Sequence, residues 1–168
     1  MAKKMKAAST PATLALDTAG IKYVAHSYSH SDSAESYGAE AAEQLGVSGD
    51  RVYKTLMVST GANSSQELAV AIVPVDATLD LKSVGAALGR KKAQMADKAT
   101  AQRRSGYVLG GISPFGQRQS SPTVLDAGAL NFETIFISGG RRGFSLQLRP
   151  QDAVKTLDAL VAAIAAQR

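Results

Sequence analysis

The stretch Val52-Tyr53-Lys54-Thr55-Leu56-Met57-Val58 decides how this chain is organised. Its β-branched and aromatic residues, without glycine or proline, predict a strand over about residues 51–59. Because side chains alternate along a strand, Lys54 shares one face with three apolar residues, Val52, Leu56 and Val58, and the other three residues share the opposite face. A lysine in that position extends its ammonium group to water, pairs with a carboxylate, or faces a pocket that receives an anion.

The chain has 168 residues, which fit one domain over residues 10–168 preceded by a short basic tail, residues 1–9. Hydrophobic residues make up 45% and charged residues 20%, which is typical of a globular protein with a genuine core. The tail carries three lysines, but no apolar segment follows it, so it is not a signal peptide. No run approaches the roughly 20 apolar residues that span a membrane, and we therefore expect a cytoplasmic protein.

The charge pattern favours a polyanionic partner, because the formal net charge is +5. Basic residues gather at positions 90–92, 98, 103–104, 118 and 141–142, and the acids lie mainly in residues 32–50 and near the C-terminus. This distribution predicts one cationic side, unless these groups are ordinary solvated ends of loops and helices. The chain has no cysteine, which excludes disulfide bonds and thiolate metal sites.

Capping residues, glycines and prolines divide the chain into helices and strands. Helices are predicted from a Thr10 cap to Gly20, from a Ser33 cap to Leu45, from Asp80 to Gly89, from an Asp97 cap to Gly106, and from Pro150 to Gln167. Strands are predicted at residues 21–26, 51–59, 68–73, 107–109, 123–126, 133–138 and 144–148, with a turn at residues 61–65 that joins the second and third as a hairpin. The sum is a single mixed α/β domain of the α+β type, with about seven strands, several joined by hairpins, and helices around them.

Two glycine-rich loops each follow a predicted strand. Residues 110–116, Gly-Gly-Ile-Ser-Pro-Phe-Gly, combine permissive glycines with a rigid proline, so their peptide groups either bind a carbonyl, ammonium or oxyanion group or simply make a tight connection. Residues 138–143, Ser-Gly-Gly-Arg-Arg-Gly, form either a nest whose two arginines suit a phosphate or a bulged hairpin with exposed arginines.

Other kinds of site find little support in the sequence. His26 and His30 span a strand-to-loop junction without a third ligand, so we predict no metal site and no cofactor. No serine lies on a nucleophile elbow. Tyr28 and Tyr37 flank a polar loop, where they either line a pocket or pack as partly buried aromatic residues.

Motifs spread from Thr10 to the C-terminus together resemble a known family. They are Thr10-Pro11-Ala12 with Gly20-Ile21, His26-x-Tyr28-x-His30, Val52–Leu56, Leu79–Lys82, Lys91-Lys92, Met95–Asp97, Gly106-Tyr107, Gly110–Gly116, Pro122-Thr123 with Asp126, and Ser138–Gly143. In this order they resemble the YbaK family of bacterial Cys-tRNA(Pro) deacylases, which are relatives of the editing domain inserted in bacterial prolyl-tRNA synthetases.

The resemblance implies a compact, strongly bent mixed sheet, mostly antiparallel, and hydrolytic removal of cysteine from mischarged tRNA(Pro), with Cys-tRNA(Cys) as a further substrate. It implies that Lys54 is the signature active-site residue and that Gly110 belongs with it in the catalytic site. The substrate-binding positions that it implies are Tyr28, Tyr37, Thr55, Gly111, Ile112, Ser113, Pro114, Ser138, Gly139, Gly140 and Arg142. Two positions depart from the family pattern, because Tyr37 stands where phenylalanine is expected and Ser145 where aspartate is common.

The mechanism that the resemblance implies is substrate-assisted: the thiol of the esterified cysteine attacks its own ester carbonyl and leaves as a thiolactone. An aminoacyl ester is already activated, so positioning and electrostatics suffice for its cleavage. In this scheme Lys54 anchors the terminal adenosine or its phosphate, and residues 110–113 hold the aminoacyl group through their backbone. The alternative is that Lys54 acts directly as a general base.

Two other functions stay open on sequence alone. One is a deacylase for Ala-tRNA(Pro) or another small aminoacyl-tRNA, and the other is a factor that binds aminoacyl-tRNA without catalysis. The basic groups at residues 90–92, 98 and 103–104 are candidates for contact with tRNA. Because the family has little tRNA selectivity of its own, prolyl-tRNA synthetase is an expected partner.

Overall fold

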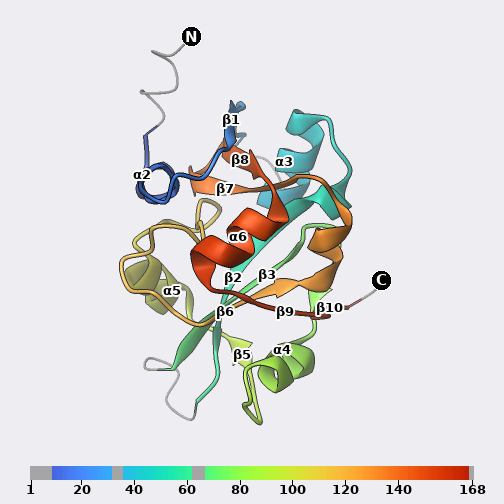
Figure 1. Ribbon diagram of the computed structural model, residues 1–168. Coiled ribbons are helices and arrows are strands. Elements are labelled where there is room, and N and C mark those ends of the chain that lie inside the picture. The colour runs from blue at the N-terminus through green and yellow to red at the C-terminus, as the bar shows by residue number, and fades with distance from the viewer. Residues whose placement is uncertain (1–8, 32–35, 62–66, 167–168) are drawn as a thin grey trace.

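The computed structural model describes residues 9–31, 36–61 and 67–166 (Figure 1). The predicted basic tail, apart from Ser9, lies outside the described residues. So do the predicted cap at Ser33 and all but the first residue of the turn at residues 61–65. The remaining predictions of helices and strands can be compared with the structure.

A mixed sheet of eight strands forms the centre of the described part of the chain. Its order is β1 (Val24–Ser27), β8 (Phe144–Leu148), β7 (Ile135–Arg141), β2 (Val52–Ser59), β3 (Leu68–Pro74), β6 (Thr123–Asp126) and β9 (Leu160–Ala162), with β5 (Gln94–Met95) paired beside the end of β2. The pairs β1–β8, β8–β7, β2–β3 and β2–β5 are antiparallel, and β7–β2, β3–β6 and β6–β9 are parallel. A small second sheet joins β4 (Thr78–Leu79) to β10 (Ala165–Ala166).

Five α-helices and two short 3-10 helices accompany the sheet in the described residues. They are α2 (Pro11–Thr18), α3 (Tyr37–Leu45), α4 (Leu81–Ala87), α5 (Lys98–Ser105) and α6 (Pro150–Leu157), with η1 (Gly49–Arg51) and η2 (Ala127–Asn131). The predicted caps Thr10 and Asp97 are confirmed, and Asp80, where a helix was predicted to begin, is also a cap, because all three accept hydrogen bonds from backbone N–H groups of the first turn. No helix in the described part of the chain is long and apolar enough to cross a bilayer.

The alternation predicted for β2 is confirmed by the packing on its two faces. Tyr53 and Met57 lie in a large buried cluster with α2 and α6. On the opposite face Val52 packs against α3, and Val58 belongs to a cluster with α4. Lys54 therefore lies on the face that carries α3 near one end of β2 and α4 near the other, and it is half-buried.

The sheet splits beside Lys54. β7 pairs with β2 only at Val52 and Tyr53, and β5 pairs with β2 only at Val58 and Ser59. No described strand pairs with the intervening residues of β2 on that side, although the other side is fully paired with β3. Figure 1 shows β7 lying across the top of the molecule while β2 and β3 run diagonally through its centre. The split leaves an opening in the sheet.

Three predicted elements differ most from the structure. The last helix ends at Leu157 instead of Gln167, because Asp158 adopts a left-handed conformation (φ 51°) and the chain then pairs as β9 and β10. Residues 107–109 form no strand and belong to the loop before residue 110. β7 continues to Arg141 through a bulge that follows Ser138, instead of ending before Gly139.

Candidate active site

A cavity of about 450 Å³ opens at the split between β2 and β7. Its volume lies in the range of small-molecule binding pockets, about 300–1,000 Å³. Segments far apart in the sequence supply its walls, namely the residues that follow β1 and β3, α3, β2, the start of α5, the loop at residues 109–112, and the β7–β8 hairpin. The lining residues are Tyr28, Ser36, Tyr37, Gly38, Ala41, Val52, Tyr53, Lys54, Thr55, Leu56, Val75, Lys98, Leu109, Gly110, Ile112, Ser138, Arg141, Phe144 and Ser145.

The loop at residues 107–116 closes one side of the cavity, and its glycines are required by close contacts. Gly110 has φ +84°, and a Cβ there would lie 2.8 Å from the ring of Tyr37. A Cβ on Gly111 would lie 2.7 Å from the backbone of Arg141, so the two glycine-rich loops touch along their main chains. The Tyr107 hydroxyl donates a hydrogen bond to the carbonyl of Phe115, which connects the two ends of the loop. Burial raises the pKa of this hydroxyl to about 12.

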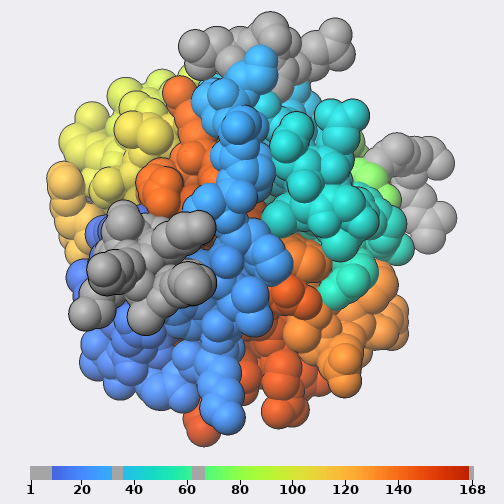
Figure 2. Space-filling model, turned by 90° about the horizontal axis from the view of Figure 1, so that it is seen from above, coloured from blue at the N-terminus to red at the C-terminus, as the bar shows by residue number. Residues whose placement is uncertain are grey.

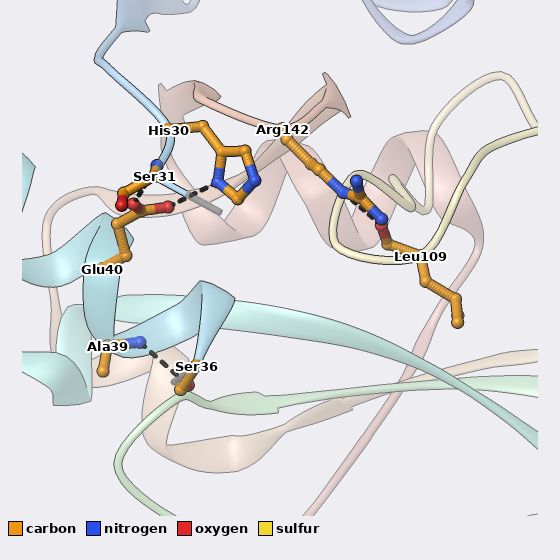
Figure 3. Close-up of polar contacts among 7 residues, drawn as sticks. All are labelled: His30, Ser31, Ser36, Ala39, Glu40, Leu109 and Arg142. Atoms are coloured by element: carbon orange, nitrogen blue, oxygen red, sulfur yellow. Dashed lines mark hydrogen bonds and ion pairs between the residues drawn. The ribbon is translucent and has the colours of Figure 1, made fainter. Parts of the chain in front are cut away.

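Tyr37, at the start of α3, forms a second wall. Hydrogen bonds of Glu40 form a polar clasp that holds α3 to the segment before it (Figure 3). Glu40, one turn further along α3, contacts the His30 ring nitrogen at 2.8 Å and accepts the Ser31 N–H at 2.7 Å. The hydrogen bond from His30, with that of the Ser31 N–H, lowers the pKa of the Glu40 carboxyl. Figure 2 shows the segment around β1 (blue) crossing this face of the molecule beside α3 (teal).

Arg142, in the turn between β7 and β8, contacts the same wall. Its Nε donates to the carbonyl of Leu109 at 2.8 Å, and its guanidinium group lies 4.9 Å from the centre of the Tyr37 ring. The ring of His30 lies 5.6 Å from that of Tyr37. The wall therefore joins α3, the loop and the β7–β8 hairpin into one assembly.

The cavity is cationic. Lys54, Lys98 and Arg141 line it, and no carboxylate lies among the described lining residues. The Arg141 guanidinium group stacks 4.5 Å from the centre of the Phe144 ring, which holds the cation at the pocket. Such a site suits a ligand that carries phosphate or a developing oxyanion.

Thr55 provides polar groups that the protein itself leaves unused. Its hydroxyl is buried in the cavity wall and has no hydrogen-bond partner among the described residues. Its peptide group also points into the split, because Met57, two residues later, accepts the Ala96 N–H on that side and peptide directions repeat every second residue. A buried donor or acceptor without a partner is costly, which indicates that a ligand or water satisfies Thr55.

Tyr28 and Ser145 meet at the back of the cavity. Burial raises the pKa of the Tyr28 hydroxyl, against hydrogen bonds with Ser145 and with the backbone of Gly143. Ser145 is 4% exposed and lies opposite Ser138 in the β7–β8 register. The serine that departs from the family pattern thus faces the cavity as a neutral hydroxyl.

The structure brings together seven of the residues predicted for the site: Lys54, Gly110, Tyr28, Tyr37, Thr55, Ile112 and Ser138. It places Gly111, Ser113, Pro114, Gly139 and Gly140 behind the lining, within the two glycine-rich loops. Arg142 lies outside the lining and supports Tyr37, and Arg141 takes its place in the cavity. Lys98 and Tyr53 also line the cavity, but they were not predicted from the sequence as lining residues. For Tyr53, the alternation along β2 predicts a side chain on the face opposite Lys54, so it gives no reason to expect both residues in one cavity.

The described residues contain no group of three or more histidine or carboxylate side chains that could hold a metal ion. The donors at the cavity are cations, hydroxyl groups and peptide groups. These groups suit an ester with a nearby phosphate better than they suit a metal cation.

The fold and the cavity define a single-domain α+β protein with a cationic cavity at a split in a mixed sheet. The sequence model of the aminoacyl-tRNA editing domain matches residues 32–156, and the chain belongs to that family. This confirms the family predicted from the sequence motifs and the class of enzyme, an aminoacyl-tRNA deacylase.

Individual relatives agree with this assignment. The chain is 34% identical, over 154 residues that cover 90% of both proteins, to an Enterococcus faecalis protein named as a Cys-tRNA(Pro)/Cys-tRNA(Cys) deacylase, EbsC. Its fold is similar to the crystal structure of a hypothetical protein, with a TM-score of 0.81, 23% identity, and coverage of 94% of this chain and 100% of the other. It is also similar to a protein described as a trans-editing enzyme for prolyl-tRNA synthetase, with a TM-score of 0.77, 22% identity, and coverage of 95% and 99%. These two structures support the predicted α+β fold.

Proposed function

We propose that this protein removes cysteine from mischarged Cys-tRNA(Pro), and from Cys-tRNA(Cys), with the substrate's own thiol as the nucleophile. The observation that carries the proposal is the composition of the cavity. Its described lining has three cations and several hydroxyl groups, but no histidine or carboxylate that could activate a serine or a water. A site of this kind positions an ester and stabilises charge, so a nucleophile within the substrate completes the reaction.

The reaction runs in two steps. The cysteine sulfur forms a bond to its own ester carbonyl carbon, the bond from that carbon to the ribose oxygen breaks, and the thiol proton ends on the ribose oxygen. Water then hydrolyses the released thiolactone to free cysteine. The 34% identity to a protein named as a Cys-tRNA(Pro)/Cys-tRNA(Cys) deacylase supports cysteine as the amino acid.

The residues have separate roles in this proposal. Lys54 anchors the terminal adenosine or its phosphate, and Arg141 adds a second cation at the cavity. The hydroxyl and peptide groups of Thr55 hold the ester, where negative charge develops on the carbonyl oxygen. Gly110 and Ile112 are the loop residues that line the aminoacyl position, since Gly111 donates its N–H to the Val108 carbonyl at 2.9 Å.

A panel of tRNAs charged with cysteine, serine or alanine tests the proposal with the purified protein. We expect rapid deacylation of Cys-tRNA(Pro) and very slow deacylation of the serine and alanine forms, because only cysteine carries the thiol. Equal turnover of Cys-tRNA and Ser-tRNA would contradict thiol assistance, and a preference for Ala-tRNA(Pro) would replace cysteine with alanine as the substrate.

Two variants separate positioning from folding. Lys54→Ala should abolish deacylation while the protein stays folded. Thr55→Val keeps the shape of the side chain and removes an unpartnered hydroxyl, so we expect slower deacylation with no loss of stability. Full activity of Thr55→Val would remove the hydroxyl from the proposed site.

Prolyl-tRNA synthetase is the proposed source of tRNA selectivity. We expect the protein alone to deacylate Cys-tRNA(Pro) and Cys-tRNA(Cys) at similar rates, and added synthetase to favour Cys-tRNA(Pro). A rate ratio that the synthetase leaves unchanged would argue against this association.

A further inference from the structure

A second cavity, of about 530 Å³, lies at the other end of β2 from the candidate active site. Three lysines line it: Lys82 in the first turn of α4, and Lys91 and Lys92 just before β5. The other lining residues are Ser59, Gly61, Leu81, Ala93 and Gln94. Figure 1 shows α4 and β5 at the end of the molecule remote from β1.

The lysines are presented by a folded turn. The N–H of Arg90 donates to the Gly85 carbonyl at 2.8 Å, which folds the segment before β5 back onto α4. The nearby acids are otherwise engaged, because Glu67 pairs with Arg90 at 3.1 Å and the Asp80 carboxylate accepts the N–H groups of Lys82 and Ser83. In the described part of the chain, no carboxylate forms an ion pair with Lys82, Lys91 or Lys92. The cavity is therefore strongly cationic.

Ser59 contributes to the wall of this cavity and is 1% exposed. Because side chains alternate along β2, its side chain lies on the same face as those of Tyr53 and Met57, opposite α4. The ligand-binding groups of the cavity are therefore the three lysine ammonium groups. Three cations close together suit the phosphate groups of a polyanion.

The same two segments of the chain contribute lining residues to both cavities. β2 contributes Lys54 to the active-site cavity and Ser59 to the second one, and the segment at residues 91–98 contributes Lys98 to the first and Lys91 and Lys92 to the second. Along an extended strand, the five residue-to-residue steps from Lys54 to Ser59 span about 17 Å. This separation corresponds to a few nucleotides of single strand between an ester in one cavity and a phosphate in the other.

We propose that the second cavity binds the backbone phosphates of the single-stranded 3′ end of the substrate tRNA, a few nucleotides before the esterified adenosine. This assignment rests on the proposed function, because that function places the esterified end in the active-site cavity. The second cavity then fixes the direction of the RNA strand, and it recognises the backbone phosphates independently of the base sequence.

Binding of uncharged RNA tests this assignment without any hydrolysis. The probe is a fluorescent RNA hairpin with a single-stranded 3′ end, and the readout is its anisotropy over a series of salt concentrations. A triple variant, Lys82→Ala with Lys91→Ala and Lys92→Ala, should lower the slope of log affinity against log salt by about 2, since each single-strand phosphate contact contributes about 0.7. The matched control, Lys22→Ala with Lys155→Ala, removes exposed lysines that line neither cavity and should change the slope much less.

A blunt-ended hairpin without the single strand should bind the wild type and the triple variant alike.

Two results would overturn the assignment: equal losses in the triple variant and the lysine control, or stabilisation by inorganic phosphate that the triple variant loses while its RNA binding is unaffected. The last result would identify a site for a small anion. Because the probe is uncharged, a wild type that binds as expected but deacylates nothing would contradict only the proposed function. A wild type that deacylates Cys-tRNA while the triple variant binds RNA normally would contradict only this site.

Discussion

Replacing Gly110 with alanine tests how closely the loop approaches Tyr37. Gly110 has φ +84°, and a left-handed residue with a side chain costs about 1–2 kcal/mol. For a chain of this length, each kcal/mol lowers the melting temperature by about 2–4 °C, so we expect a decrease of about 2–8 °C. The new Cβ would lie 2.8 Å from the Tyr37 ring, which must move away from Arg142 and His30 and thereby change the wall of the cavity.

The matched control for this variant is Gly106→Ala. Gly106 has the same φ, +84°, but its added Cβ would contact only Arg118, with the nearest atom at 3.4 Å, and neither residue lines the cavity. Both variants should therefore lose similar stability, while only Gly110→Ala should lose deacylation of Cys-tRNA in single-turnover assays. Wild-type activity in Gly110→Ala, or an equal loss of activity in Gly106→Ala, would refute the role given to the contact with Tyr37.

Three further predictions concern stability. The pKa of Glu40 lies below its ordinary value of 4.5, so the clasp stabilises the fold above pH 4.5, and this stabilisation is lost as the pH falls through the lowered pKa. The melting temperature of the wild type should therefore exceed that of Glu40→Gln at neutral pH, and the difference should disappear in acid. Tyr107→Phe leaves a buried carbonyl without its donor and should cost about 1–3 kcal/mol in urea denaturation, whereas Tyr23→Phe, whose hydroxyl bonds an exposed carboxylate, should cost clearly less. Ile72→Ala empties a fully buried position and should cost about 2–5 kcal/mol, whereas Leu14→Ala, at a position that is 58% exposed, should stay within about 0.5 kcal/mol.

Local signals in the sequence predicted the elements that depend on local physics. Thr10, Asp80 and Asp97 cap their helices as expected, because capping needs only a side-chain oxygen and the next turn. The alternation along β2 correctly placed Lys54 on a face with apolar neighbours, since the strand is packed on both sides.

The C-terminal segment could not be predicted in this way. Leu160, Val161 and Ile164 continue the helical spacing of α6, so periodicity alone favours one long helix. What decides otherwise is distant in sequence: β9 pairs with β6, and the Asp126 carboxylate accepts the N–H groups of Ile164 and Ala165 at 3.0 Å each.

The basic residues that line the candidate site could not be predicted from the local sequence either. Regular alternation from Ser138 would place Arg142 in the cavity, but the bulge inserts Gly139 and Gly140 and brings Arg141 there instead. Lys98 joins the cavity because β5 pairs with the end of β2 and carries the start of α5 with it. The Gly139-Gly140 pair is compatible with a bulge, but it does not say which arginine the bulge brings to the cavity, and the pairing of β5 with β2 leaves no signal in the local sequence.

The split between β2 and β7 also bears on solubility. A strand edge without a partner is a template on which another chain can add a strand, and here such an edge lies in the middle of a sheet instead of at its border. The loop at residues 107–116 lies across the cavity from this edge, because Gly110 and Ile112 line the same cavity as Thr55 of β2. We therefore expect that shortening the loop would expose the edge and increase self-association.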